Sequence, residues 1–179
     1  AALARSLSAW VSTAVKVAAF GALLRVVLGF YQWDSEMWTS MVWIGSVITM
    51  SVANIAALVQ SDLKRMLAYS SIAHACYILI PFIAFEWQGI SVSSSVGFYL
   101  MAYVLMTMGA FAVVSALTGE SQERSDVRFL SGIGRTQPFL GFAMTFFMLS
   151  LAGIPPTIGF FGKYYLFNQA MKAGFVWLV

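Results

Sequence analysis

The sequence predicts an all-α membrane protein that crosses the bilayer several times. Of its 179 residues, 60% are hydrophobic and only 9% are charged, whereas soluble domains contain about 25% charged residues. Apolar runs of about 20 residues, the length that crosses a hydrocarbon core of about 30 Å, recur along the chain. A double proline interrupts the last long run. These observations predict about five transmembrane helices, one of them broken, and the start of a sixth.

The first four predicted helices cover residues 7–31, 38–59, 64–86 and 92–117. The second and fourth contain no charged residue. We assign the whole chain, residues 1–179, to a single transmembrane domain.

Residues 138–172 form the broken helix of the prediction. At 1.5 Å per residue this run is too long for one straight crossing, and it contains Gly153, Pro155, Pro156 and Gly159. Proline removes a backbone N–H and collides with the preceding turn, which leaves carbonyl groups unpaired. In a membrane, such groups are tolerated only inside protein or beside water. We therefore expect two half-helices that line a hydrated cavity.

A further helix is predicted to begin within residues 174–179. Its apolar run is uninterrupted at Val179, and the chain opens on an alanine without a recognisable targeting signal. We interpret the chain as a piece of a longer membrane protein, or as one part of a split one.

Basic residues gather in the loops on one side of the predicted membrane. If the spans alternate, the N-terminus and the loops at 60–65 and 118–137 share that side. Six basic residues there against two opposite predict a cytoplasmic or matrix location for it. The six are Arg5, Lys64, Arg65, Arg124, Arg128 and Arg135, and the two are Arg25 and Lys172. The loop at 118–137 mixes both charges and is interpreted as a solvated connector.

Three ionisable side chains are predicted to lie at membrane depth, namely Lys16, His74 and Lys163. A central lysine costs about 2.5 to 3.5 kcal/mol on insertion scales, so it normally faces a bundle interior or water. Ser12 and Thr13 precede Lys16 by one helical turn and form a polar stripe with it. We expect this stripe to face inward. The alternative is a lysine that snorkels to the headgroups.

A second polar stripe surrounds His74 and consists of Ser70, Ser71 and Tyr77. Histidine titrates near neutral pH and therefore suits a proton relay. The alternative is a neutral histidine that hydrogen-bonds across helices and only stabilises their packing. Lys64, at the start of the same helix, is a further candidate for the path or an anchor at the membrane boundary.

Lys163 is the strongest candidate because it combines a charge at membrane depth with the broken helix. The carbonyl groups at the end of the first half-helix would attract a cation, and Lys163 follows Gly162 in the second half. The alternative is a proline kink with an incidental lysine. No aspartate or glutamate lies at depth in the predicted spans. Either another segment supplies the counter-charge, or the lysines lose their protons for part of the time.

Other kinds of site are excluded by the residues that the sequence lacks. It has no nucleotide-binding glycine motif, no paired carboxylates and no pair of histidines for haem. The single cysteine, Cys76, excludes a disulfide framework within this chain, and with only one histidine the sequence argues against a metal site. The net charge of +3 is too small to indicate nucleic-acid binding. We expect no redox centre, cofactor or metal in this chain.

Three motifs resemble the antiporter-like membrane subunits of respiratory complex I, especially the N type, called subunit 2 in mitochondria. They are TAVKVAAFGALLRV at 13–26, QSDLKRMLAYSSIAHACY at 60–77 and MLSLAGIPPTIGFFGKYYLF at 148–167. The second is shared with related cation/proton antiporter and membrane-bound hydrogenase subunits. The lysine in GFFGKYYLF is typical of the N type, whereas the M type usually has glutamate there. The resemblance covers essentially the whole chain.

The resemblance implies a fold of about fourteen helices with two inverted five-helix repeats, each containing one broken helix. Lys16 would be the linking lysine between two half-channels, and His74 part of a central hydrophilic axis. Lys163 would be the lysine of the second broken helix, near the exit to the positive side. The first half of the subunit, with the glutamate and lysine of the entry half-channel, is missing from this chain.

The implied function is proton translocation in the membrane arm of NADH:quinone oxidoreductase, in the bacterial cytoplasmic or mitochondrial inner membrane. Flavin, iron–sulfur clusters and quinone would belong to partner subunits. Expected partners are other membrane-arm subunits, including neighbouring antiporter-like subunits, the missing part of this subunit, and lipids, but not nucleic acid. The alternatives are a subunit of a sodium/proton antiporter or membrane-bound hydrogenase, and a truncated segment that only scaffolds the arm.

Overall fold

The computed structural model is all-helical over the residues that it describes, which are 2–29, 35–83, 85–118, 126–172, 174 and 176. This confirms the predicted all-α class. The long helices are α1 (Ala2–Gly29), α2 (Ser35–Leu58), α3 (Leu63–Ile83), α4 (Phe85–Thr118), α6 (Pro138–Ala152) and α7 (Ile158–Lys172). Between α4 and α6 lie a 3-10 helix, η2 (Val127–Leu130), and the short α5 (Ile133–Thr136).

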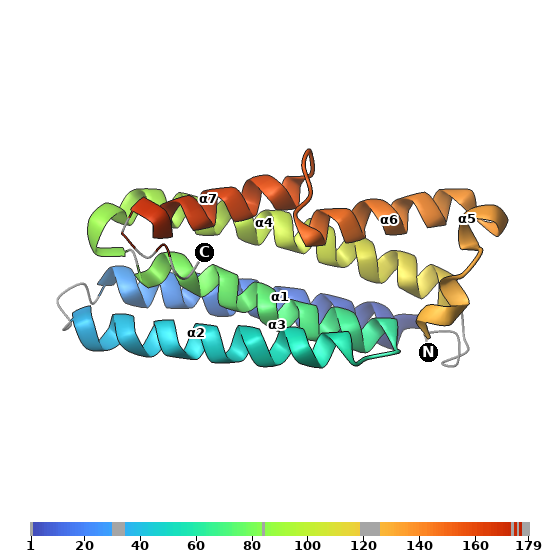
Figure 1. Ribbon diagram of the computed structural model, residues 1–179, viewed down its shortest axis with the longest axis horizontal. Helices are drawn as coiled ribbons and strands as arrows, with labels where there is room; N and C mark the ends of the chain where they lie inside the picture. Colours follow the sequence, from blue (N-terminus) through green and yellow to red (C-terminus); the bar gives the residue numbers. More distant parts are fainter. Residues whose placement is uncertain are drawn as a thin grey trace.

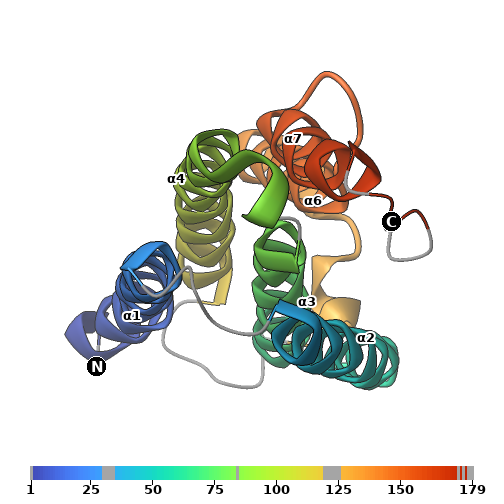
Figure 2. The same ribbon diagram turned by 90° about the vertical axis from the view of Figure 1, so that its left-hand side faces the viewer.

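The helices form two layers with their axes roughly along one direction. One layer contains α1, α2 and α3, and the other contains α4, α6 and α7 (Figure 1). In the end view, α3 lies at the centre of the bundle, between α2 on one side and α4 and α7 on the other (Figure 2). Side chains of α3 therefore meet every part of the fold that contains a candidate residue.

The break predicted within residues 138–172 is present as two helices, α6 and α7, which lie end to end along α4 (Figure 1). Each has 15 residues. At 1.5 Å per residue each half is therefore about 22 Å long, which is less than the bilayer core of about 30 Å. The junction between the halves lies beside the middle of the bundle.

Two apolar clusters pack the layers together on either side of His74 along α3. One cluster contains Leu63 and Leu67 of α3, together with residues of α4 and α6. The other contains Ile78 and Phe82 of α3, together with residues of α4 and α7. The polar centre of α3 is thus enclosed above and below by well-packed apolar side chains.

Some of the helices are apolar and have exposed apolar side chains. By length and composition, two described segments could cross a membrane, Thr39–Leu58 in α2 and Ser93–Thr118 in α4. Along α2, Met41, Ile48 and Ile55 are each more than half exposed. An exposed apolar surface of this extent marks contact with lipid or with other protein.

The loops predicted to share one side of the membrane do lie at the same end of the bundle. Asp62 pairs with Asp126 in an isolated β-bridge, and the backbone N–H of Val127 donates to the carbonyl oxygen of Ser61 at 2.9 Å. Helix α1 begins at this end too (Figure 1). Part of the predicted connector is ordered as η2, whose first turn is capped by Asp126 accepting from the Arg128 N–H at 2.8 Å.

Some element boundaries differ from the expected ones. Helix α3 ends at Ile83 and α4 begins at Phe85, although the sequence predicted a loop up to residue 91. The polar residues of this segment favoured a loop, but they are compatible with a helix at modest cost. The predicted helix at 174–179 falls largely outside the described residues.

Candidate functional site

The junction of α6 and α7 uses a side chain from one half-helix to complete the end of the other. The Lys163 Nζ donates hydrogen bonds to the carbonyl oxygens of Leu151, at 2.9 Å, and Ala152, at 3.0 Å. The last four carbonyl groups of a helix have no partner within the helix. The lysine of α7 thus binds two of the four at the end of α6.

Gly153 explains why these two carbonyl groups are left for the lysine. It adopts a left-handed conformation with φ 85°, which a glycine takes without steric cost. Its N–H donates to the carbonyl oxygens of Leu149 and Ser150, and the N–H of Ile154 also donates to Leu149. This C-cap satisfies the first two of the four carbonyl groups, and the ammonium group satisfies the remaining two.

Gly159 allows the two half-helices to come into direct contact. A side chain there would collide with the carbonyl oxygen of Ser150 and lie 2.8 Å from the Met106 sulfur. The Gly159 N–H instead donates to the Ser150 hydroxyl at 3.3 Å. The connection between α6 and α7 contains Pro155 and Pro156, which are joined by a cis peptide bond.

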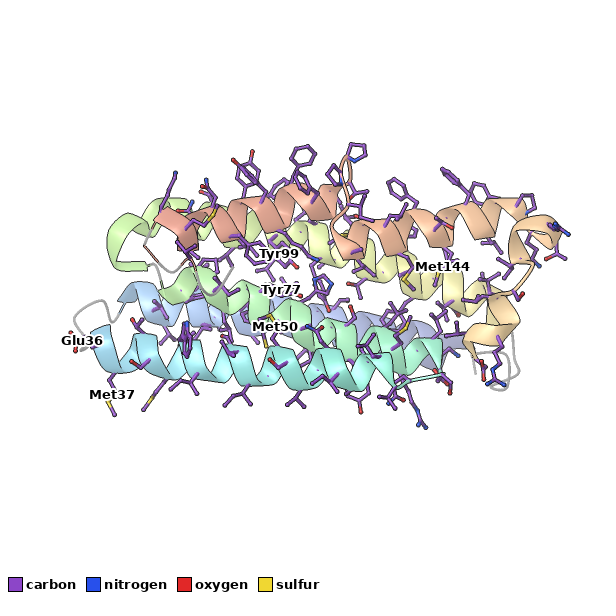
Figure 3. All side chains as sticks on the ribbon, in the orientation of Figure 1. Glu36, Met37, Met50, Tyr77, Tyr99 and Met144 are labelled. Atoms are coloured by element: carbon purple, nitrogen blue, oxygen red, sulfur yellow. The ribbon has the colours of Figure 1, made fainter. Side chains whose placement is uncertain are left out.

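His74 lies in the middle of the bundle and is surrounded by tyrosines. Its side chain is 3% exposed, and its Nδ1 forms a hydrogen bond of 2.5 Å with the Tyr99 hydroxyl. The rings of Tyr77 and Tyr103 lie 5.5 and 5.6 Å from the imidazole, centre to centre. Tyr77 and Tyr99 occupy the space between the two layers (Figure 3). The imidazole is therefore enclosed by aromatic rings with polar tips.

Lys16 reaches from α1 to α3 rather than to the membrane surface. Its Nζ donates to the carbonyl oxygen of Ser71 at 2.8 Å and to the Ser71 Oγ at 2.6 Å. The Ser71 hydroxyl in turn donates to the carbonyl oxygen of Ala68 at 2.7 Å. Thr13, one turn earlier on α1, is buried, as the inward stripe requires, whereas the Ser12 side chain lies outside the described residues. The snorkelling alternative does not agree with this geometry.

Tyrosine rings connect both lysines to the histidine. The Lys16 Nζ lies 5.8 Å from the ring centre of Tyr103, and the Lys163 Nζ lies 5.2 Å from that of Tyr77. Both rings also contact His74. Cations are attracted to the faces of aromatic rings at such distances. Lys16, His74 and Lys163 therefore belong to one continuous chain of contacts that crosses the bundle.

A cavity of about 370 Å³, lined by both apolar and polar side chains, lies between α2, α3 and the broken helix. One water molecule takes up about 30 Å³ of the liquid, so the cavity has room for several. Its polar lining consists of Asn54, Ser70, His74, Tyr77 and Lys163. No carboxylate belongs to the lining, as far as the chain is described. His74 and Lys163 therefore line the same cavity.

Comparison with known proteins assigns the chain to a family. A family model described as "NADH:quinone oxidoreductase/Mrp antiporter, TM" matches residues 2–179. The chain belongs to this antiporter family. Its relatives include NADH-quinone oxidoreductase subunit N of Trichlorobacter lovleyi, 44% identical over 172 residues. Subunit N 1 of Solibacter usitatus is 42% identical over 171 residues. These names confirm the resemblance to the N type.

Each of these two antiporter-family relatives is aligned over 96% of this chain but only 35% of its own length. The chain therefore spans about a third of the curated relatives that it matches. A similar solved structure is respiratory complex I from Thermus thermophilus with bound aureothin. The match has a TM-score of 0.67 and 40% identity, and it covers 78% of this chain and 30% of the other. Membership of the family makes this chain part of a membrane protein.

In the folded bundle, most of the predicted site residues lie close together. Ser71 binds Lys16, Tyr77 lies beneath Lys163, and Ser70 lines the cavity. Lys64 instead lies in the first turn of α3, where its backbone N–H donates to the Asp62 carboxylate at 2.8 Å. Its side chain is not among those that line the cavity in the described part of the chain. The roles of all these residues in proton transfer stay predictions.

Sequence reasoning missed three residues of this antiporter-family site, namely Asn54, Tyr99 and Tyr103. All three lie in the predicted spans 38–59 and 92–117, which contain no charged residue, so no intramembrane charge drew attention to them. A weak signal was present, because a buried tyrosine hydroxyl usually has a hydrogen-bond partner. An asparagine in an apolar helix likewise usually has a polar neighbour.

Proposed function

We propose that this chain is part of the proton-translocating membrane arm of NADH:quinone oxidoreductase, where Lys16, His74 and Lys163 form a proton path. One observation carries the proposal: the Lys163 ammonium group is bound by carbonyl oxygens of a broken helix, beside a cavity that His74 also lines. Electron transfer, with its flavin, iron–sulfur clusters and quinone, belongs to partner subunits. The names of the relatives, which are subunits of NADH-quinone oxidoreductase, support membership of that complex.

Lys163 exchanges its proton with water in the cavity. An ammonium group has three N–H donors, and two of them point to the carbonyl oxygens of Leu151 and Ala152. The third is available to the cavity. After the proton has left, the neutral amine keeps two N–H groups and still satisfies both carbonyl oxygens. The broken helix is thus stable in both charge states of the lysine.

Protons reach this cavity from Lys16 through α3. The Ser71 hydroxyl accepts a hydrogen bond from Lys16, and His74 follows one helical turn later on the same face. His74 can take up a proton and release it again, because its imidazole exists in a neutral and a charged form. Charges of equal sign repel strongly where water is scarce, so the three groups pass one proton at a time rather than being charged together.

The counter-charges come from outside this chain. The described cavity lining contains no carboxylate, whereas charged side chains at membrane depth pair with one another or with backbone carbonyl groups. The missing part of the subunit and neighbouring antiporter-like subunits supply these counter-charges. In this arrangement α1 is the last helix of the first inverted repeat, and the helices that follow it belong to the second. Its N-terminus lies on the cytoplasmic or matrix side of the bacterial cytoplasmic or mitochondrial inner membrane.

The rival function is that of a subunit in a multi-subunit sodium/proton antiporter, because the matched family also includes Mrp antiporters. Purification of the tagged full-length subunit from its own membranes separates the two. Co-purification with flavin and iron–sulfur subunits, together with NADH-dependent proton pumping, is expected for the proposed function. Sodium-dependent proton exchange without NADH turnover would favour the rival.

Lys163→Met in the full-length subunit tests the path itself. The variant should assemble and transfer electrons but pump fewer protons for each NADH oxidised. Lys172→Met is the matched control, because Lys172 lies exposed in the last turn of the same helix. Unchanged pumping by an assembled Lys163→Met complex would remove Lys163 from the path. That result would favour the alternative in which this chain only scaffolds the membrane arm.

A further inference from the structure

Tyr99 connects three of the helices that form the site, namely α4, α3 and α7. It belongs to α4, its side chain is fully buried, and its hydroxyl forms the 2.5 Å hydrogen bond with the Nδ1 of His74 on α3. Its ring packs against Gly162 on α7: a Cβ at that glycine would lie 2.8 Å from the Tyr99 Cδ2. Gly162 immediately precedes Lys163. One tyrosine thus contacts both the histidine and the backbone next to the lysine.

The phenol can serve both protonation states of the imidazole. A tyrosine hydroxyl both donates and accepts hydrogen bonds, and a neutral imidazole has one donor and one acceptor nitrogen. When Nδ1–H donates to the phenol oxygen, Nε2 of the neutral imidazole has no proton and can accept one from the cavity. The hydrogen bond from Nδ1–H to Tyr99 stays in place when Nε2 gains or loses that proton, so the contact is compatible with both states.

The hydrogen bond between Tyr99 and His74 also determines which ring nitrogen of His74 is available to the cavity. His74 belongs to the lining of the cavity that Lys163 shares, whereas Tyr99 is not among the described lining residues. Nδ1 is occupied by Tyr99. Nε2 is therefore the nitrogen that remains for exchange with the cavity. A hydrogen bond at one ring nitrogen sets the tautomer and the orientation of the whole imidazole ring.

We propose that Tyr99 is a positioning residue of the proton path, which binds Nδ1 of His74 so that Nε2 exchanges protons with the cavity at Lys163. This inference rests on the proposed function, because it assigns Tyr99 a role only if His74 takes part in proton transfer. The packing against Gly162 gives the residue a second task. It fixes the position of His74 relative to α7, the half-helix that contains Lys163.

The test compares Tyr99→Phe with Tyr164→Phe in the full-length subunit of the assembled complex. Phenylalanine retains the ring that packs on Gly162 and removes only the hydroxyl. Tyr164 is 51% exposed on α7, so its variant is a matched control. Pumping per NADH should fall about fivefold in Tyr99→Phe, the effect of one lost buried hydrogen bond. It should be unchanged in Tyr164→Phe, with assembly and NADH oxidation normal in both.

A double variant distinguishes positioning from simple packing. If Tyr99 acts through His74, Tyr99→Phe has no further effect on pumping in a His74→Ala background. Normal pumping by Tyr99→Phe, or an additional loss in that background, would overturn the inference while leaving the role of His74 intact. Normal pumping by His74→Ala would overturn both the role of Tyr99 and the role of His74 in the proposed path. Failure of the Tyr99 inference alone is therefore distinguishable from failure of the proposed function.

A second substitution keeps the test decisive if Tyr99→Phe does not assemble. Trifluorotyrosine at position 99 retains the ring and the hydroxyl, but its phenol is more acidic. Proton exchange at His74, and hence pumping, should change while assembly is retained. Pumping equal to that of the unsubstituted complex would overturn the inference.

Discussion

The Lys163 Nζ lies 2.9 Å from the carbonyl oxygen of Leu151, although the two residues are twelve positions apart in the chain. The lysine belongs to one half-helix and the carbonyl group to the other. The break therefore provides the site that binds the ammonium group, and the ammonium group completes the helix end that the break exposes. A change to either partner is expected to affect both charge movement and the geometry of the junction.

Lys163→Arg tests whether Lys163 must lose its proton. Arginine retains the positive charge and the N–H donors but stays protonated in proteins. The complex should assemble, while pumping per NADH should fall by about tenfold or more, as for the loss of an acid–base group. Proton uptake by closed vesicles, divided by the rate of NADH oxidation, measures the effect. Full pumping by the arginine variant would mean that Lys163 acts only as a fixed charge.

Gly159→Ala tests the contact between the half-helices. The added methyl group would collide with the carbonyl oxygen of Ser150, and overpacking of this kind costs about 1 to 3 kcal/mol. The complex should lose this subunit at a lower temperature in a thermal-stability assay. Gly97→Ala on α4 is the control, because nothing lies within 4 Å of its added methyl group. Equal stability of both variants would contradict the close contact.

Ser71→Ala removes one of the two groups that bind Lys16. The backbone carbonyl oxygen of Ser71 remains as an acceptor, so the loss should be partial. We expect pumping to fall about two- to fivefold, the range for one hydrogen bond. Ser51→Ala is the control, since Ser51 only donates to a carbonyl oxygen of its own helix on an exposed face of α2. If both variants pump alike, the Ser71 hydroxyl is not part of the path.

Single cysteines test the orientation predicted from the basic loops. Ser61→Cys and Glu36→Cys replace exposed residues at opposite ends of α2, and both are made in a Cys76→Ala background. A membrane-impermeant maleimide should label position 36 from the periplasmic or intermembrane side and position 61 only from the cytoplasmic or matrix side. The reverse pattern of labelling would invert the proposed topology.

The sequence by itself determined the all-α class, the position of the break and the residue that completes it. Each of these follows from local chemistry. Apolar runs determine which segments form membrane helices. Proline and glycine interrupt them wherever they occur. A lysine one helical turn beyond the break has unpaired carbonyl groups within reach, so Lys163 could be identified without a fold.

Only the tertiary structure decided which distant side chains meet. Tyr99 lies 25 positions from His74, and Ser71 lies 55 positions from Lys16. The spans 38–59 and 92–117 contain no charged residue, so no charge pattern shows that Tyr99 is buried or that Asn54 lines the cavity. The rotation of each helix about its axis is set by packing against its neighbours. The binding of both lysines and the histidine by α3, α4 and the broken helix is therefore a property of the assembled bundle.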